Sequence, residues 1–307
     1  MRYLVTGGAG FLGSHLIEAL LQRGHSVVCL DNYSTGKREN IQRFANQIQV
    51  FSGDLLDTKI IQSLIREVDA IYHLGAQISV SRSVREPLYD ASVNINGMLN
   101  LLQAACKAEI SRVVFTSTGG AIYGEPSTLP VPESTLEEPE SPYGISKLTG
   151  ERYLLWYFRQ YGLSYGIIRP ANIFGPRQDP LGEAGVISIF LERLRSNRAL
   201  HIFGDGRDTR DYVYVDDIVE LCIRAMETPV NETFNGGTGQ QTSVLDLISV
   251  IETVTGLTAN KQFDPPRAGD IHNIALDSTK ARRLLGWDPK TDMLTGIKKT
   301  WDWFNSS

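Results

Sequence analysis

The stretch TGGAGFLGSH at residues 6–15 decides the fold. It follows a short apolar run and precedes a helix-like run, and Gly7, Gly10 and Gly13 have the spacing GxxGxxG. Glycine at such positions lets the chain turn tightly, lets the backbone approach a pyrophosphate and lets the helix pack closely on the sheet. Because the free amides of a helix N-terminus favour anions, we expect this turn to bind the phosphates of a dinucleotide.

A carboxylate follows at the end of the next apolar run, SVVCLD at residues 26–31. Asp31 ends this predicted strand, where a carboxylate would accept hydrogen bonds from the adenosine ribose hydroxyls and repel a 2′-phosphate. We therefore expect the cofactor to be NAD. Lys37 and Arg38, a few residues further on, are the features that argue for NADP instead.

The first half of the chain alternates apolar runs such as YLVTG, AIYHLGA and RVVFTST with amphipathic segments such as SHLIEALLQRG. This alternation predicts a parallel sheet covered by helices on both faces. The expected class is α/β, a Rossmann-type doubly wound parallel sheet with a smaller, irregular C-terminal substrate domain. We place the boundary between residues 1–169 and 170–307, and we expect some later segments to return to the first domain.

Composition excludes several classes of protein. The 30 Lys and Arg side chains against 35 Asp and Glu give a net charge of −5 that is spread along the chain, so no nucleic-acid partner is expected. The three cysteines lack metal-binding spacing, which favours reduced thiols and no metal site. Since no apolar run approaches the length of a membrane helix and the start does not resemble a signal peptide, we expect a soluble, cytoplasmic protein.

Tyr143 and Lys147 lie four residues apart in the helix-like run SPYGISKLTGERYLL, residues 141–155. At this spacing two side chains project from the same face of a helix and can reach one site. The same two residue types are also common on half-exposed helices without any function. The spacing alone therefore leaves both interpretations open.

Several motifs occur in an order that resembles the extended short-chain dehydrogenase/reductase family, and within it the nucleotide-sugar epimerases and dehydratases. They are TGGAGFLG, SGDL, HLGA, NINGMLNLL, FTSTGGAIYG and YGISK in the first half, and RPANIFGPRQDP, TRDYVYV and PPRAGD in the second. The resemblance covers almost the whole chain. It implies that residues 1–169 bind NAD and that residues 170–307 bind a nucleotide sugar.

The resemblance also implies the catalytic residues. Tyr143 would be the base that takes a proton from a sugar hydroxyl, and Lys147 would lower the pKa of that phenol and hold the nicotinamide ribose. Thr118 would be the third catalytic residue. Thr118 is preferred to its neighbour Ser117, which could share the role, because this segment has one more residue between its hydroxyls and Tyr123 than the commonest epimerase pattern.

Binding residues follow from the same motifs. The cofactor-binding residues implied are Gly7, Gly10, Phe11, Leu12, Gly13, Asp31, Asn32, Asp54, Leu55, Leu74, Ala76, Asn94, Tyr143, Lys147 and Pro170. The substrate-binding residues implied are Asn172, Arg210, Arg267, Asp270 and Ile274. Two arginines suit a diphosphate, which accepts forked, charge-assisted hydrogen bonds.

The expected reaction is the NAD-dependent epimerisation of a UDP-hexose at C4, through a transient 4-keto sugar. Gly119 and Gly120 stand where similar dehydratases have an acidic pair and similar decarboxylases a glutamate, which argues against those reactions. The alternatives are 4-epimerases of UDP-N-acetylglucosamine or UDP-glucuronate, a UDP-N-acetylglucosamine 5,6-dehydratase, and a catalytically silent NAD-binding regulator. In similar epimerases the residue four positions after Asp270 borders the C2 substituent of the sugar, where a large aromatic side chain excludes an N-acetyl group and Cys or Ser admits it. Ile274 occupies this position. Because its side chain is intermediate in volume and stiff, we expect UDP-glucose and UDP-galactose to be preferred over N-acetylated sugars.

A homodimer is expected as well. The predicted helices around INGMLNLLQAAC and KLTGERYLLWYF carry more apolar residues than a single buried stripe requires. In similar enzymes these two helices pair across a two-fold axis.

Overall fold

A seven-stranded sheet with the order β11-β6-β5-β4-β1-β2-β3 forms the centre of the protein, and every neighbouring pair in it is parallel. The computed structural model describes residues 1–182, 185–266 and 271–306. The strands of this sheet are β1 (Arg2–Thr6), β2 (Ser26–Asp31), β3 (Gln49–Ser52), β4 (Ala70–His73), β5 (Arg112–Thr116), β6 (Ser164–Pro170) and β11 (Glu232–Gly236). The predicted doubly wound α/β class is confirmed.

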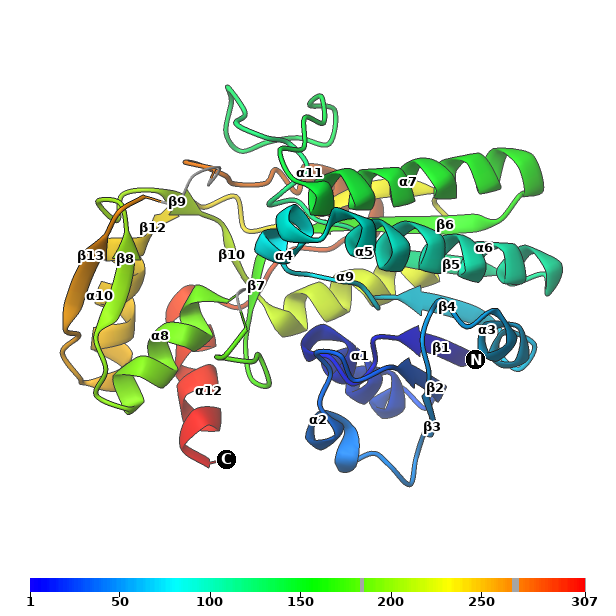
Figure 1. The fold of residues 1–307 in the computed structure, drawn as a ribbon, viewed down its shortest axis with the longest axis horizontal. Coiled ribbons are helices and arrows are strands. Elements are labelled where there is room, and N and C mark those ends of the chain that lie inside the picture. Colours follow the sequence, from blue (N-terminus) through cyan, green and yellow to red (C-terminus); the bar gives the residue numbers. More distant parts are fainter. Residues whose placement is uncertain (183–184, 267–270, 307) are drawn as a thin grey trace.

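Helices cover both faces of this sheet (Figure 1). Alternate residues of each strand point to opposite faces, so Leu4 packs with one hydrophobic cluster and Val5 with another. On the Leu4 face lie α3 (Thr58–Ile65), α6 (Gly97–Lys107) and α7 (Pro142–Tyr161), and on the Val5 face lie α1 (Phe11–Gln22) and α9 (Val215–Glu227). The strands are thus buried on both sides, which explains their nearly continuous apolar sequences.

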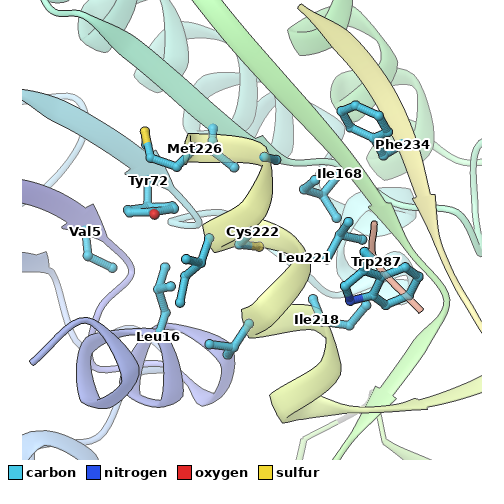
Figure 2. Close-up of a cluster of buried hydrophobic side chains, with 14 of the residues drawn as sticks. Val5, Leu16, Tyr72, Ile168, Ile218, Leu221, Cys222, Met226, Phe234 and Trp287 are labelled. Atoms are coloured by element: carbon cyan, nitrogen blue, oxygen red, sulfur yellow. The ribbon is translucent and has the colours of Figure 1, made fainter. Parts of the chain in front are cut away.

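Helix α9 comes from the second half of the chain but completes the first layer. Figure 2 shows its side chains between α1 and the sheet. The contributors drawn there include Leu16 of α1, Ile218, Leu221, Cys222 and Met226 of α9, and Val5, Tyr72, Ile168 and Phe234 of the strands. Trp287 closes the cluster, and its indole Nε1 donates to the backbone oxygen of Asp217 at 2.8 Å. Residues beyond 170 therefore return to the sheet, through α9 and β11.

A second, smaller lobe lies beside the carboxyl ends of the strands (Figure 1). Its elements are β7 (Asn172–Phe174), α8 (Val186–Arg195), β8 (Leu200–Phe203), β9 (Thr209–Arg210), β10 (Tyr212–Tyr214), β12 (Thr242–Ser243), α10 (Val244–Thr255), β13 (Lys261–Asp264) and α12 (Met293–Ser306). These strands form three two-stranded sheets, β10-β7, β12-β9 and β13-β8. A separate hydrophobic cluster that includes Phe190, Leu247 and Ile251 holds the lobe together.

The remaining short helices surround the sheet: α2 (Arg38–Gln42), α4 (Val80–Arg85), α5 (Pro87–Ala91), the π-helix η1 (Ser92–Asn96) and α11 (Thr279–Leu285). Across the described ranges, no helix is both long and apolar enough to cross a membrane.

Candidate active site

The glycine turn between β1 and α1 has no room for side chains at its closest point. A Cβ atom at Gly13 would lie 2.2 Å from the backbone oxygen of Gly7. Gly7 itself has a φ of +67°, and its amide donates to the backbone oxygen of Leu30 at 2.8 Å. The turn therefore brings the N-terminus of α1, which begins at Phe11, to the carboxyl edge of the sheet, as phosphate binding requires.

Asp31 lies at the same edge, at the end of β2. Its carboxylate accepts hydrogen bonds from the amides of Ala9, at 2.9 Å, and Tyr33, at 2.8 Å. Burial raises the pKa of Asp31, and these two amides oppose that rise. Because a carboxylate has about four lone-pair positions, Asp31 keeps acceptor capacity for ribose hydroxyls.

The two cations that argue for NADP are engaged elsewhere. Lys37 forms an ion pair with Asp179, with 3.1 Å between Nζ and Oδ1. The guanidinium carbon of Arg38 lies 4.2 Å from the centre of the Tyr33 ring. A 2′-phosphate would have to break these contacts to engage either cation, and Asp31 would repel it, which favours NAD.

The other residues expected to contact the cofactor follow strand ends or the helices behind them. Phe11 and Leu12 open α1, Asn32 follows β2, Asp54 and Leu55 follow β3, Leu74 and Ala76 follow β4, Asn94 lies in η1 and Pro170 ends β6. Asn32 donates from Nδ2 to Asp54 at 2.7 Å, which ties two of these segments together. The carboxyl ends of the strands thus collect the set along one edge, the usual place for ligands in such sheets. Contact of each residue with NAD stays a prediction.

Helix α7 carries Tyr143 and Lys147 into this edge. It starts with the N-cap Ser141, whose hydroxyl accepts from the Gly144 amide at 3.2 Å, and with Pro142 in the first turn. It ends at Gly162, which has a left-handed φ of 73°. These local signals fix the helix over residues 142–161, so the four-residue spacing does place both side chains on one face.

Lys147 is buried, and its ammonium Nζ donates to the backbone oxygen of Thr116 at 2.9 Å. The same nitrogen lies 5.9 Å from the centre of the Tyr143 ring. Burial lowers the pKa of Lys147 to about 8, while the negative charges of Asp90 and Glu151 oppose this. Lys147 is therefore a cation beside the phenol at neutral pH.

The phenol of Tyr143 has a hydroxyl partner in Thr118. Burial raises the pKa of Tyr143, the charge of Asp90 raises it further, and a hydrogen bond with the Thr118 side chain lowers it. Ser117 is buried, and its Oγ has no hydrogen-bond partner among the described residues. The geometry thus favours Thr118 over Ser117 as the residue that shares a proton with Tyr143, and the catalytic role of either stays a prediction.

The residues expected to bind substrate come from the second lobe. Asn172, in β7, is exposed, and its Oδ1 would lie 3.6 Å from a Cβ atom at Gly120. Arg210, in β9, donates from Nη1 to the backbone oxygens of Thr209 and His272 at 3.0 and 3.2 Å.

Ile274 is 2% exposed, and its amide donates to the backbone oxygen of Thr209 at 3.2 Å, so it lies beside the strand that carries Arg210. Arg267 and Asp270 lie outside the described residues.

Sequence reasoning missed two buried carboxylates that act on this site, Asp90 and Glu151. Glu151 was within reach of the spacing argument, because it follows Lys147 by one further helical turn on the same face. It pairs with Arg169 of β6. Asp90, in α5, is distant in sequence from α7, and only the packing of the two helices brings it to the site.

In residues 1–182, 185–266 and 271–306, no group of three or more His, Cys, Asp or Glu side chains is arranged to bind a metal ion.

Comparison with known proteins defines the class. Residues 3–237 match the family model of the NAD dependent epimerase/dehydratase family, and the chain belongs to this family. It is 45% identical to the UDP-glucose 4-epimerase of Mycolicibacterium smegmatis over 310 residues, covering 100% of this chain and 99% of that protein. The expected family membership is confirmed.

Similar proteins with solved structures are also nucleotide-sugar epimerases. The chain is similar to the UDP-glucose 4-epimerase of Thermotoga maritima crystallised with UDP-glucose, with a TM-score of 0.97, 45% identity and coverage of 100% and 99%. It is also similar to the UDP-glucose 4-epimerase of Thermus thermophilus in complex with NAD, with a TM-score of 0.95, 40% identity and full coverage of both chains.

Proposed function

We propose that this chain is an NAD-dependent isomerase that interconverts UDP-glucose and UDP-galactose at C4 through a 4-keto sugar. The observation that carries the proposal is the placement of Tyr143 and Lys147 on one face of α7 beside the dinucleotide turn, with Lys147 Nζ 5.9 Å from the centre of the Tyr143 ring. UDP-glucose 4-epimerases that align over the full chain at 40–45% identity support this choice of substrate.

NAD fits the residues present. The turn without side chains at Gly7 and Gly13, the helix N-terminus at Phe11 and the carboxylate of Asp31 are the parts that a dinucleotide needs. When bound, NAD supplies the centre that accepts a hydride from the sugar C4 and returns it. Lys147 would hold the nicotinamide ribose, and Asp31 the adenosine ribose.

Tyr143 moves the proton. Its phenolate would take the proton of the sugar 4-hydroxyl and later return it to the oxygen of the ketone. Lys147 favours the phenolate by charge, and Thr118 favours it by a hydrogen bond.

One base is sufficient for epimerisation, and the site has no room for a second at Gly119. A Cβ atom there would lie 2.3 Å from Cδ1 of Leu276 and 3.0 Å from the backbone oxygen of Pro170. A 4,6-dehydratase or a decarboxylase of the usual type needs a carboxylate in this segment. Gly120 is less crowded, with Asn172 Oδ1 at 3.6 Å from an added Cβ, so it is the lack of a carboxylate at both glycines, together with the close packing at Gly119, that supports a 4-epimerase over those two reactions.

The second lobe would bind the nucleotide sugar. Arg210 and Arg267 are proposed to bind the diphosphate of the substrate. Asp270 is proposed to bind a ribose hydroxyl of the nucleoside, and Asn172 is proposed to contact the substrate. Residues 1–169, with the returning elements α9 and β11, would form the NAD-binding unit, and the rest of 170–307 the substrate-binding unit.

We also propose a homodimer. Helix α7 lies beside α6 (Figure 1), and it carries several exposed aromatic side chains. Tyr153, Trp156, Phe158 and Tyr161 are 36%, 48%, 37% and 59% exposed. The Trp156 and Tyr161 rings are in edge-to-face contact, and exposed aromatic side chains of this kind are typical of an interface, so a second copy is expected to cover them. The three free cysteines fit a reducing, cytoplasmic location.

The test is to incubate purified protein with UDP-glucose and follow the products by proton NMR. Formation of UDP-galactose without added reductant is the expected result. An unsaturated sugar product would instead identify a 5,6-dehydratase. No turnover of UDP-glucose, UDP-N-acetylglucosamine or UDP-glucuronate by protein that retains NAD would identify a binding protein and overturn the proposal.

A further inference from the structure

Asp90 is a fully buried carboxylate beside the site, with an exposed fraction of 0%. It lies in α5, which runs into the π-helix η1, an irregularity often found at functional sites. Its carboxylate accepts side-chain hydrogen bonds from neutral donors. Gln77 Nε2 and Asn94 Nδ2 donate to Oδ1 at 2.7 and 3.0 Å, and Ser146 Oγ donates to Oδ2 at 2.6 Å.

The three donors come from three parts of the site. Gln77 follows β4 in the segment expected to contact NAD, Asn94 lies in η1, and Ser146 lies on α7 between Tyr143 and Lys147. The side chain of Asn94 also bonds to the Gln77 backbone: its Oδ1 accepts from the backbone amide at 2.9 Å, and its Nδ2 donates to the backbone oxygen at 3.0 Å. Asp90 is therefore the centre of a polar network that joins the cofactor edge to the catalytic helix.

The two buried carboxylates near Lys147 differ in how their charge is balanced. Glu151 has its own cation, since both of its oxygens accept from Arg169, at 2.9 and 2.6 Å. The hydrogen-bond partners of Asp90 within the described ranges are neutral. The cation on which its charge acts is Lys147, whose pKa it raises.

We propose that Asp90 is a positioning residue of this site, whose buried carboxylate fixes α7 through Ser146 and holds a negative charge against the residue that precedes Lys147. The proposal rests on the proposed function for its meaning in catalysis. Asp90 lies outside the proposed catalytic set of Thr118, Tyr143 and Lys147. It would act through Lys147 and Ser146, without contacting the substrate.

Other ionisable groups facing Lys147 do not explain the same effect. His73, on β4, is buried, and its pKa is lowered to about 3, so it is neutral in the working range. Glu151 also raises the pKa of Lys147, but less than Asp90 does, and its own charge is balanced by Arg169. Tyr143 is a neutral phenol until it gives up its proton.

Asp90→Asn separates charge from geometry. Oδ1 of the new amide can still accept from Gln77 and Asn94, and its Nδ2 can donate to Ser146, whose hydroxyl is able to accept. The matched control is Ser146→Ala, which removes the tie to α7 but keeps the charge. Asp90→Ser removes the charge with a shorter side chain and replaces Asp90→Asn if that variant does not fold.

The measurement is the titration of Lys147 by its ¹³Cε NMR signal, assigned by its absence in Lys147→Met. In Asp90→Asn the midpoint should fall by about one unit, the lower end of what a close opposite charge contributes. In Ser146→Ala it should stay unchanged. An unmoved midpoint in Asp90→Asn, or an equal shift in both variants, would overturn the proposal. This readout needs no turnover, so it is decided even if the proposed function fails.

The pH profile of kcat gives the second readout. Loss of the Asp90 charge lowers the pKa of Lys147, so the alkaline limb should move to lower pH. The same loss lowers the pKa of Tyr143, which Asp90 raises, so the acid limb should move in the same direction. Ser146→Ala should reduce kcat without moving either limb. A profile in Asp90→Asn that is lower but not displaced would count against the proposal.

Discussion

Arg169 and Glu151 form a two-point ion pair in the interior, with Nε to Oε1 at 2.9 Å and Nη2 to Oε2 at 2.6 Å. Their side chains are only 3% and 4% exposed. Arg169 precedes Pro170, the last residue of β6, and Glu151 lies one turn beyond Lys147 on α7. The pair therefore ties α7 to the strand that leads into the second lobe.

Arg169→Met should reduce the free energy of unfolding by about 3–5 kcal/mol, because it leaves a buried carboxylate without its partner. Arg152→Met is the matched control. Arg152 is 61% exposed and pairs with Glu137, the second carboxylate that Arg169 contacts, so its loss should cost at most about 1 kcal/mol. Denaturant unfolding at a fixed excess of NAD measures both. Equal losses in the two variants would contradict the role given to the buried pair.

Tyr143→Phe should lower kcat by at least about 100-fold, since it removes the proposed proton acceptor and keeps the ring. NAD should stay bound. Tyr161→Phe, which removes an exposed hydroxyl from the same helix, is the control and should leave turnover unchanged. Retention of more than about a tenth of the activity in Tyr143→Phe would show that another group takes the proton.

Thr118→Val should reduce kcat more than Ser117→Ala does. Thr118 hydrogen-bonds to Tyr143 and lowers the pKa of its phenol, whereas Ser117 Oγ has no partner in the described structure. Removal of the Thr118 hydroxyl should also move the acid limb of the kcat profile to higher pH. The reverse ranking of the two variants would assign the catalytic hydroxyl to Ser117.

Protein denatured after purification should release NAD and no NADP. Asp31 ends β2 with free acceptor capacity, while Lys37 and Arg38 are engaged with Asp179 and Tyr33. Enzymatic cycling assays specific for each dinucleotide make the measurement. NADP in the extract would show that the charge at Asp31 does not decide the cofactor.

The sequence was sufficient for features that depend on neighbouring residues. The glycine turn, the strand ending at Asp31 and the helix carrying Tyr143 and Lys147 follow from local spacing and capping. The partners of Asp90 and Arg169 could not be predicted in this way, because Ser146 is 56 residues from Asp90 and Glu151 is 18 from Arg169. Such pairs depend on how helices pack against the sheet.

Most elements of the second lobe could not be predicted from the sequence either. Its strands are only two to four residues long, too short for a periodic pattern to be recognised. Asp211, for example, is a buried carboxylate that accepts hydrogen bonds from the amides of Thr238, Gly239 and Leu276. Nothing in the sequence around Asp211 indicates these partners, which come from two later segments of the chain.

The choice of sugar is the prediction that depends most on a single side chain. Ile274 is expected to border the substituent at C2 of the sugar. Its side chain is 2% exposed and packs in the hydrophobic core, and its amide donates to the Thr209 backbone oxygen. A stiff, β-branched side chain in such packing cannot move aside for an N-acetyl group. The protein should therefore prefer UDP-glucose and UDP-galactose, by about 1–3 kcal/mol in transition-state free energy, the usual effect of a small steric change.

Ile274→Ser should raise kcat/KM for UDP-N-acetylglucosamine and leave kcat/KM for UDP-glucose nearly unchanged. Ile274→Leu is the control, because it keeps the volume of the side chain and should bring no gain for the N-acetylated sugar. Since Ile274 belongs to the core, thermal unfolding must be measured alongside, so that a general loss of folded protein is not taken for a change in specificity. Equal or better turnover of UDP-N-acetylglucosamine by the unmodified protein would contradict the assignment and indicate an enzyme for N-acetylated sugars.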